Sequence, residues 1–387
     1  MRVGFILSQS VMGWLGGYNY IRNLLWALYE YKERAIEPVI FVEEKTDLSS
    51  NDLPPFEIIK TSLIRKKSFI WFVRVVVRRL LGHDYFLDKF LQVNNIDVLS
   101  HVNHLGKQST THAIGWIPDF QHKHLPSLFT DSEIKSRDSR FLSICQYSTC
   151  VIVSSQDAKS DLCKYYPDYC DKAEILRFVS GIPNDENLVS LDALQKKYHF
   201  KAPYFYMPNQ FWAHKNHRLV VNALANLKNE GIEITVIASG NTRDYRQPEY
   251  YQDLMKFVKA CGVEREFKVV GVVKYSEVIA LMRYCVSLIN PSLFEGWSTS
   301  VEEAKSLGKK IILSDIPVHR EQAPHGGIFV DPHDEKGLAK VMKRILGQYE
   351  TYTKHEDPEW VTEDYYSRRH EFAKRYEDIV YKYISGR

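Results

Sequence analysis

The stretch VSLINPSLFEGWSTSVEEAKSLGKKIILSD (residues 286–315) contains one complete strand–loop–helix–strand unit. Its first apolar run, Val286–Asn290, ends at Pro291 and is followed by a loop that contains Gly296. Thr299–Gly308 has helical spacing, and KKIILSD is a second apolar strand. This order predicts a βαβ unit, the building block of a parallel sheet.

The same alternation extends in both directions along the chain. The predicted strands of the first half are RVGFIL, PVIFV, DVLSHV, AIGWIP, TCVIVSS and AEILRFV, with helical spacing at Gly16–Tyr31 and Arg65–Leu81. The predicted strands of the second half are YFYMPN, ITVIASG, FKVVG, VSLINP, KKIILSD and GGIFVDP. Helical segments separate them at Asn216–Glu230, Pro248–Cys261, Tyr275–Cys285, Thr299–Gly308 and Asp334–Gln348.

Two consecutive series of this kind predict an α/β protein with two Rossmann-like, doubly wound domains. We expect the first domain over residues 1–180, the second over 181–362, and a charged C-terminal helix over 363–387 that crosses back to the first. Ligands of such sheets bind beyond the carboxyl ends of the strands. The sequence therefore predicts a ligand held in a cleft that the two domains face.

Composition narrows the class of protein. Apolar residues make up 44% of the chain and aromatic residues 13%, which is typical of a globular protein. A net charge of +3 does not indicate a nucleic-acid partner. The six cysteines form no C-x-x-C pair and no metal-ligand spacing, so we expect reduced, mostly buried thiols and a cytoplasmic protein. No apolar run reaches the roughly 18 residues of a membrane-spanning helix.

Two carboxylates flank the helix start in the opening stretch. Thr299 and Glu302 fit a T-x-x-E capping box, which makes Ser300 the first helical residue and places Glu303 one turn in. Such a helix mouth can bind phosphate. Glu303 then has two interpretations: an ordinary first-turn acid that complements the helix dipole, or an acceptor for the hydroxyls of a ribose or hexose.

FEGWSTSVEEA resembles the E-x7-E signature of the retaining glycosyltransferases of family 4, which have the GT-B fold. The usual wording is E-G-F-G-L-P-x-L-E-A; Trp297 replaces the aromatic residue, Ser298 the second glycine and Ser300 the proline. The resemblance covers Tyr204–Leu346 closely and the first half loosely. It implies that Glu303 binds the ribose hydroxyls and that Glu295 lies against the donor sugar. It also implies that the N–H groups of Gly296, Trp297, Ser298 and Thr299 hold the diphosphate.

The loop in YFYMPNQFWAHKNHRLVVNAL resembles the G-R-x4-K loop of the same family. The resemblance implies that Lys215 neutralises the leaving phosphate. Gln210 fills the position of the family's arginine, so one of the two expected cations is missing. Asn209, Gln210 or His214 can donate hydrogen bonds there but carry no permanent charge. The wording N-Q-F-W-x-H-K-N-H is similar to a subgroup that works on bacterial surface polysaccharides.

Several glycines lie at strand ends. Gly240, and Gly271 with Val272, end two strands of the second domain, where family members surround the nucleobase; simple turn chemistry is the alternative. Gly16 and Gly17 follow the first strand, in the loop that approaches the donor phosphates in the family; a plain helix-start turn is as good an interpretation. With Gly13 they do not have the spacing of a G-x-G-x-x-G fingerprint.

GWIPDFQHKHLPSLF gathers Asp119, His122, Lys123 and His124 within six residues after a strand. Family members carry H-D at this strand end, but here Pro118 precedes Asp119. Either His122 substitutes for the absent histidine or Asp119 alone contacts the acceptor. Metal binding by His122 and His124 is a third interpretation, for which no third ligand is evident.

IRKKSFIWFVRVVVRRLLGH, around residues 65–81, is an amphipathic helix candidate. Phe69, Val73, Val76 and Leu80 share one face, and Lys67, Trp71, Arg74 and Arg78 mark another. Basic groups with a tryptophan suit the anionic inner face of a membrane. A core helix with a solvated basic side is the alternative.

Taken with the resemblance, these features predict a retaining hexosyltransferase that uses a nucleotide-sugar donor as substrate and a glycan or lipid-linked acceptor. No D-x-D occurs in the chain, so we expect no metal and no other cofactor. GDP-mannose is the first candidate donor by resemblance, with UDP-sugars next. The rival hypotheses are a nucleotide-sugar-binding partner protein without turnover and an oxidoreductase, which lacks its glycine fingerprint.

Overall fold

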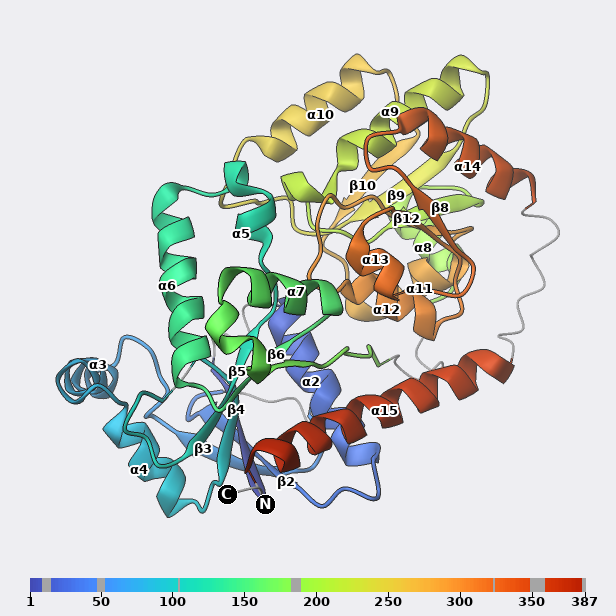
Figure 1. Cartoon of the computed structure of the whole chain (residues 1–387). Helices are drawn as coiled ribbons and strands as arrows, with labels where there is room; N and C mark the ends of the chain where they lie inside the picture. Colours follow the sequence, from blue (N-terminus) through green and yellow to red (C-terminus); the bar gives the residue numbers. More distant parts are fainter. Residues whose placement is uncertain are drawn as a thin grey trace. The chain divides into compact units, whose positions relative to one another are not determined.

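The computed structural model describes residues 1–8, 15–46, 53–103, 105–181, 189–322, 324–348 and 359–384. They form two compact units (Figure 1). Unit 1 consists of Met1–Phe120, Asp131–Ser180 and Tyr366–Arg387, and unit 2 of Gln121–Thr130 and Gly181–Tyr365. The segment 121–130 belongs to unit 2, so the prediction of one continuous domain over 1–180 is wrong at this point.

The described part of unit 1 contains a parallel sheet with the strand order β3-β2-β1-β4-β5-β6-β7. Its strands are β1 (Arg2–Leu7), β2 (Glu37–Glu43), β3 (Glu57–Thr61), β4 (Val98–Val102), β5 (His112–Ile117), β6 (Cys150–Val153) and β7 (Ala173–Ile175). The sequence prediction missed β3. This edge strand carries only two consecutive apolar residues and is largely exposed, so it lacks the apolar run of a central strand.

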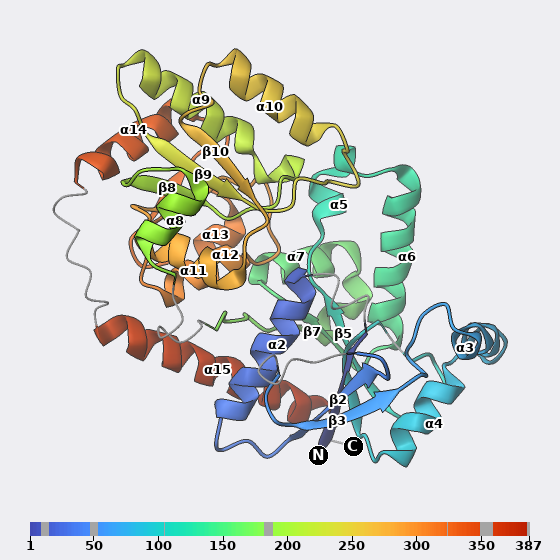
Figure 2. The same ribbon diagram turned by 180° about the vertical axis from the view of Figure 1, so that it is seen from behind.

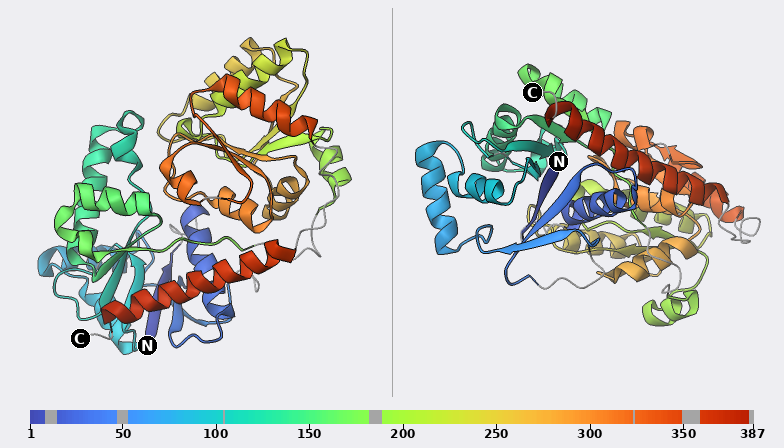
Figure 3. Two further views of the ribbon diagram at one scale, coloured as in Figure 1. Left: turned by 45° about the vertical axis from the view of Figure 1, so that its right-hand side comes forward. Right: turned by 90° about the horizontal axis from the view of Figure 1, so that it is seen from below.

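The helices of unit 1 flank this sheet. They are α2 (Leu15–Glu30), α3 (Phe69–Leu81), α4 (Tyr85–Val93), α6 (Asp131–Tyr147), α7 (Gln156–Tyr165), the 3-10 helix η2 (Pro167–Lys172) and, from Tyr366 onward, α15 (Glu359–Ile384). Figures 2 and 3 show α15 running beside α2. Glu377 of α15 accepts hydrogen bonds from the backbone N–H groups of Ala35 (2.6 Å) and Ile36 (2.9 Å). The C-terminal helix therefore completes unit 1.

Aromatic side chains fill the centre of unit 1. The Tyr20 ring stacks on Trp116 at 4.6 Å and lies 5.1 Å from His101. Tyr376 of α15 donates a hydrogen bond to the Ser100 hydroxyl (2.7 Å). Burial lowers the pKa of His101 to about 3, so this imidazole is neutral.

The described part of unit 2 contains a second parallel sheet, with the strand order β10-β9-β8-β11-β12-β13. Its strands are β8 (Tyr204–Met207), β9 (Thr235–Ser239), β10 (Phe267–Gly271), β11 (Leu288–Asn290), β12 (Ile311–Ser314) and β13 (Gly327–Val330). Its helical segments are α5 (Gln121–His124), η1 (Pro126–Leu128), α8 (Leu191–Tyr198), η4 (Ala213–Lys215), α9 (His217–Asn229), α10 (Tyr250–Ala260), α11 (Tyr275–Tyr284), α12 (Thr299–Ser306), α13 (Pro317–Gln322) and α14 (Glu335–Gly347).

Both faces of this second sheet are covered by helices. Phe205 and Met207 of β8 pack into the cluster that contains residues of α9, α10 and α14. Tyr204 and Tyr206 point to the other face, into the cluster with α8, α11 and α12. Alternate residues of one strand therefore serve two cores, which is why these strands read as continuous apolar runs in the sequence.

Both sheets have the order 3-2-1-4-5-6 of a doubly wound Rossmann-like fold, the first with an added seventh strand. The predicted fold class is confirmed. In such a sheet the connections leave in opposite directions from the first and the fourth strand, and ligands bind beside the ends of these two strands. In unit 2 these strands are β8 and β11.

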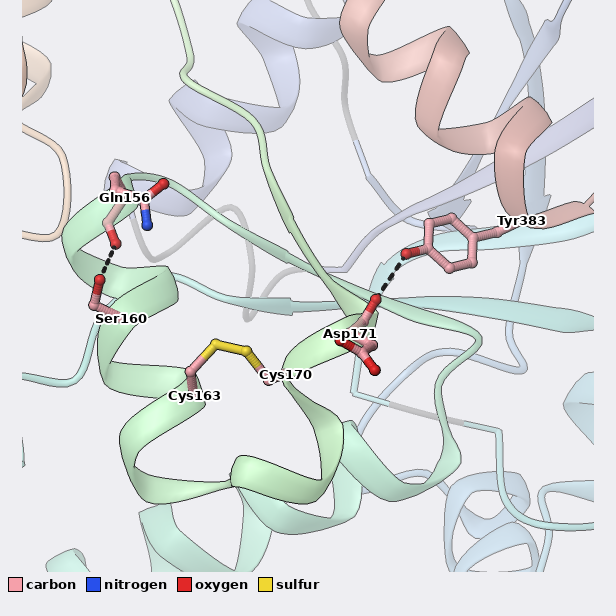
Figure 4. Close-up of a disulfide and its surroundings, with 6 residues drawn as sticks. All are labelled: Gln156, Ser160, Cys163, Cys170, Asp171 and Tyr383. Atoms are coloured by element: carbon pink, nitrogen blue, oxygen red, sulfur yellow. Dashed lines mark hydrogen bonds between the residues drawn. A yellow bond between two sulfur atoms is a disulfide. The ribbon is translucent and has the colours of Figure 1, made fainter.

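The prediction that all cysteines are reduced is wrong for one pair. Cys163 in α7 and Cys170 in η2 form a disulfide, with their Cα atoms 4.6 Å apart (Figure 4). The chain reverses between them, because the Tyr166 N–H closes α7 on Leu162 O (2.8 Å) and η2 begins at Pro167. No C-x-x-C spacing signals this contact, which the turn creates. The next residue, Asp171, accepts a hydrogen bond from the Tyr383 hydroxyl at 3.1 Å (Figure 4).

None of the helices in the described ranges combines the length and the apolar character that crossing a membrane requires.

Candidate functional site

The site predicted from the sequence begins at the carboxyl ends of β8 and β11. The loop after β8 leads to Lys215 at the end of η4, and the loop after β11 carries Glu295. The Lys215 Nζ lies 2.6 Å from Oε1 of Glu295, and the two side chains are 16% and 9% exposed. Residues 80 positions apart thus form a nearly buried ion pair where a doubly wound sheet binds its ligand.

The two loops are tied together by their own polar groups. The Asn216 side-chain amide donates to Pro291 O (3.1 Å) and to Pro332 O (2.8 Å). The Leu293 N–H donates to His214 O (2.8 Å). Asn216 has a φ of 57°, in the left-handed region that asparagine tolerates better than most residues. The Lys215–Glu295 pair is therefore held by a fixed framework.

Glu295 is ionised throughout the physiological pH range. Burial alone would raise its pKa, but the nearby Lys215 ammonium outweighs this effect and lowers the pKa to about 2. The same oxygen accepts a hydrogen bond from the Ser292 hydroxyl (2.7 Å). A carboxylate in this state can accept hydrogen bonds or stabilise positive charge, but it has no proton to donate.

The surroundings of Glu303 shift its pKa in the opposite direction, upward. It lies on α12, only 5% exposed, and burial raises its pKa to about 7, although a hydrogen bond with the Tyr275 side chain works against this shift. Both interpretations of Glu303 from the sequence, a first-turn acid that complements the helix dipole and an acceptor for sugar hydroxyls, stay predictions. Two glutamates eight residues apart are held in different protonation regimes, a feature found at functional sites.

The predicted capping box is absent. The N-cap of α12 is Ser298, one residue before Thr299, and no side chain caps it. The Ser298 hydroxyl accepts a hydrogen bond from the Asn290 amide (2.8 Å). Gln322 of α13 instead accepts from the Ser298 N–H (3.1 Å) and donates to the Glu302 carboxylate (3.0 Å).

This contact changes the predicted diphosphate site. The Ser298 N–H, one of the four expected donors, already has Gln322 as its partner, while Trp297 and Thr299 are half-buried beside it. Sequence reasoning missed Gln322 because it comes from a separate helix and carries no spacing signal.

The end of β9 packs against the Gln210 loop, where the Phe211 N–H donates a hydrogen bond to Asn241 O (2.9 Å). Gly240 has a φ of 148°, and a Cβ atom there would lie 2.5 Å from Asn209 O, so only glycine fits. Its N–H donates to Gly271 O (2.9 Å). Val272, the next residue, is 74% exposed. Glycine at position 240 thus permits the close approach of two loops, which goes beyond ordinary turn chemistry.

Three buried histidines surround the lysine loop. Burial lowers the pKa values of His214, His217 and His319, so their rings are neutral near pH 7. The His217 ring stacks on Phe211 at 4.4 Å, and His319 Nδ1 lies 3.1 Å from the Ser314 hydroxyl. Because these rings are neutral, Lys215 is the charged side chain of the lysine loop.

A second cation, missed by the sequence analysis, lies close to the same loop. The Arg246 side chain is 4% exposed, and its guanidinium lies 4.8 Å from the centre of the Trp212 ring. One Nη donates to the Gln121 side chain (2.8 Å), and Nε lies 3.4 Å from Asp244. The other Nη is buried without a hydrogen-bond partner among the described residues.

The candidate acceptor residues lie in different units. Asp119 belongs to unit 1 and pairs with Arg137 of α6 (3.3 Å). His122 belongs to unit 2, is 1% exposed and lies 6.3 Å from the Phe129 ring. The His124 ring lies 5.0 Å from Phe294. Among the described residues no group of three His, Cys, Asp or Glu side chains is placed to hold a metal.

Gly16 and Gly17 lie within the first turn of α2 instead of the loop before it. Gly13 is outside the described residues.

This fold and site define a class of proteins. Residues 192–357, which include Lys215, Glu295 and Glu303, match the family model described as "Glycosyl transferases group 1". The two Rossmann-like units are those of the GT-B fold. The matched part of the second unit is similar to group 1 glycosyltransferases.

Particular relatives agree with that class. The chain is 28% identical over 227 residues to the O-antigen chain mannosyltransferase RfbU of Salmonella typhimurium; the match covers 58% of this chain and 59% of that protein. A glycosyltransferase structure from Rickettsia africae has a TM-score of 0.67 at 16% identity, with 100% and 98% of the chains covered. Anabaena HepE in complex with UDP and glucose has a TM-score of 0.63 at 14% identity, with 98% and 96% covered.

Proposed function

We propose that this protein is a retaining glycosyltransferase that moves a hexose from a nucleotide-diphosphate donor to a hydroxyl of a glycan or lipid-linked acceptor. The observation that carries the proposal is the buried Lys215–Glu295 pair at the ends of β8 and β11. A mannosyltransferase among the relatives makes GDP-mannose the first candidate donor, and a neighbour solved with UDP makes UDP-sugars the second.

Each charged group has a role in this proposal. Lys215 releases Glu295 and binds the diphosphate, where it neutralises the charge that builds as the sugar leaves. One preorganised donor of this kind contributes about 3–4 kcal/mol to the transition state. Glu295, ionised at neutral pH, faces the sugar and stabilises its developing positive charge. Glu303 accepts hydrogen bonds from the ribose hydroxyls.

The reaction exchanges one glycosidic bond for another on the same face of the sugar. The bond between the anomeric carbon and the phosphate oxygen breaks, and a bond to the acceptor oxygen forms. The acceptor's hydroxyl proton passes to the departing phosphate oxygen. Charge on the phosphate is balanced by Lys215, so the proposed step needs no divalent cation, and activity should persist in EDTA.

Arg246 is the residue that compensates for Gln210 in this proposal. Its guanidinium lies against Trp212 of the same loop, and one buried Nη has no hydrogen-bond partner among the described residues. R246Q is expected to weaken donor affinity by about tenfold or more, since a charge-assisted hydrogen bond contributes roughly 1.5–3 kcal/mol. Q210R in the R246Q background should recover part of that loss; no recovery would contradict the compensation.

The deciding experiment is a transfer assay with a panel of GDP-, UDP-, ADP- and dTDP-sugars, preceded by a thermal-shift screen for the donor. K215Q and E295Q should bind weakly or turn over at least 100-fold more slowly, and the product should retain the donor's anomeric configuration. Donor binding without transfer or hydrolysis would favour the alternative, a nucleotide-sugar-binding partner protein. Binding of NAD in place of any sugar nucleotide would favour an oxidoreductase.

A further inference from the structure

Helix α3 of unit 1 turns its apolar face away from the protein. None of its residues is buried. Phe69 is 81% exposed, Phe72 60%, Val76 40% and Leu80 80%. Their spacing of three or four residues places them on one side of the helix. Figures 1 and 2 show α3 at the outer margin of unit 1, beside α4. The alternative of a core helix with a solvated basic side is therefore wrong.

Arg74 fixes this orientation from the opposite side of the helix. Its Nη2 lies 2.6 Å from Oδ2 of Asp84, and these side chains are 11% and 8% exposed. The same guanidinium donates to Leu63 O. An ordinary surface helix buries its apolar face and exposes its charges. Here the nearly buried Arg74–Asp84 pair holds the Arg74 side of the helix inward, so the opposite, apolar side faces outward.

Both ends of α3 are capped, which stabilises the helix at its termini. The Ser68 hydroxyl accepts a hydrogen bond from the Trp71 N–H (3.1 Å). Gly82 adopts a φ of 71° and its N–H donates to Arg78 O (2.9 Å). Serine and a left-handed glycine are the residues that these two positions favour. The exposed apolar face is thus a fixed surface.

The exposed charges that neighbour α3 in the sequence have one sign. The exposed charged residues between positions 58 and 92 are all basic: Lys60, Arg65, Lys66, Lys67, Arg79 and Lys89. The acidic residues of the same range, Asp84 and Asp88, are buried. Tyr85 and Phe86, at the start of α4, add exposed aromatic surface.

We propose that α3 docks unit 1 onto an anionic lipid bilayer, lying in the plane of the headgroups. A helix of 13 residues is about 20 Å long, enough for Phe69, Phe72, Val76 and Leu80 to enter the interface together. Lys66, Lys67 and Arg79 then meet lipid phosphates. Interfacial helices combine an apolar face with basic residues in this way.

A second copy of the chain fits this surface less well. A two-fold contact through α3 brings the same basic residues of both copies together, and like charges repel. An anionic membrane satisfies both the apolar and the basic groups. The charge pattern therefore favours lipid over self-association.

The test is flotation of the full-length protein with vesicles of phosphatidylcholine alone or with 30% phosphatidylglycerol, at about 0.1 M and 0.5 M NaCl. We expect binding to the anionic vesicles, weakened by salt. F69S/F72S should abolish it. K66A/K67A should weaken partitioning by about 30-fold, since each basic residue contributes roughly fivefold near such a surface. L142S, which changes an exposed leucine of α6, is the matched control and should bind like the wild type.

Two results would overturn the inference: no flotation of the wild type, or F69S/F72S binding that equals the wild type. Dimers in sedimentation that F69S/F72S converts to monomers, with no vesicle binding, would assign the face to a second copy. Circular dichroism checks that each variant is folded. Because no sugar nucleotide is present, the outcome is independent of the proposed transferase activity.

Discussion

Glu295 and Glu303 belong to one motif, yet their surroundings give them opposite properties. Glu295 has a cation at 2.6 Å, whereas Glu303 is buried beside the Tyr275 side chain, and their pKa values are about 2 and about 7. A low pKa keeps a carboxylate charged for electrostatic work. A pKa near neutrality makes the hydrogen-bonding role of Glu303 depend on pH.

Replacing Glu303 should change how stability depends on pH. Its pKa in the folded state is above the usual 4.5, so ionisation opposes folding increasingly as pH rises from 4.5 through 7. E303Q removes this cost. We expect E303Q and wild type to differ little at pH 4.5 and the variant to gain up to about 3 kcal/mol at pH 8. Urea denaturation at both pH values measures it; a constant difference would contradict the raised pKa.

Lys215 and Glu295 should show strong coupling. K215Q leaves a buried carboxylate without its cation, which we expect to cost about 3 kcal/mol of unfolding free energy. K215Q/E295Q removes both charges and should recover most of that stability while donor binding stays lost. A double-mutant cycle by urea denaturation measures the coupling. Additive losses would show that the pair is not an isolated buried unit.

At the scale of elements, the Cys163–Cys170 disulfide closes a short turn between α7 and η2. Cross-linking so short a loop restricts the unfolded chain and contributes about 2–3 kcal/mol by the chain-entropy model. We expect C163S/C170S to lose that much stability. C261S, a substitution at a half-buried free cysteine, is the control. Intact-mass analysis with and without reductant tests whether the disulfide is present. An unchanged mass after reduction would contradict the disulfide and the expected loss of stability.

At the scale of the molecule, the last helix completes a unit that begins at the first residue. Tyr376 and Glu377 lie in unit 1 more than 270 residues after their partners Ser100 and Ala35. Deletion of residues 366–387 should therefore unfold unit 1 selectively, because buried aromatic surface and two backbone N–H groups lose their partners.

Calorimetry of that truncated chain should lose the transition of unit 1, while unit 2 keeps its own two clusters and one transition. The conservative variant E377Q should stay close to wild type, and E377A should lose about 2–4 kcal/mol from unit 1. Loss of both transitions on truncation would show that the units do not fold independently.

Apolar runs and loop motifs predicted much of the secondary structure and several candidate site residues from the sequence. The central strands of both sheets follow from local patterns, because a strand buried on both faces must be apolar along its length. The helices α2, α3, α9, α10, α11, α12 and α14 were also predicted from spacing, whereas α4, α6, α7, α8 and α13 were missed. The two faces of the Arg65–Leu81 segment were also visible in its spacing.

Only the tertiary structure decided which groups meet. Gln322 at the mouth of α12, Arg246 against Trp212, the Cys163–Cys170 bond and the outward turn of α3 by Arg74 all depend on contacts between separate elements. Periodicity shows which side of an element is apolar, but not what that side contacts. The contacts between side chains of separate elements decide that, and they also set the charge states of Glu295 and Glu303.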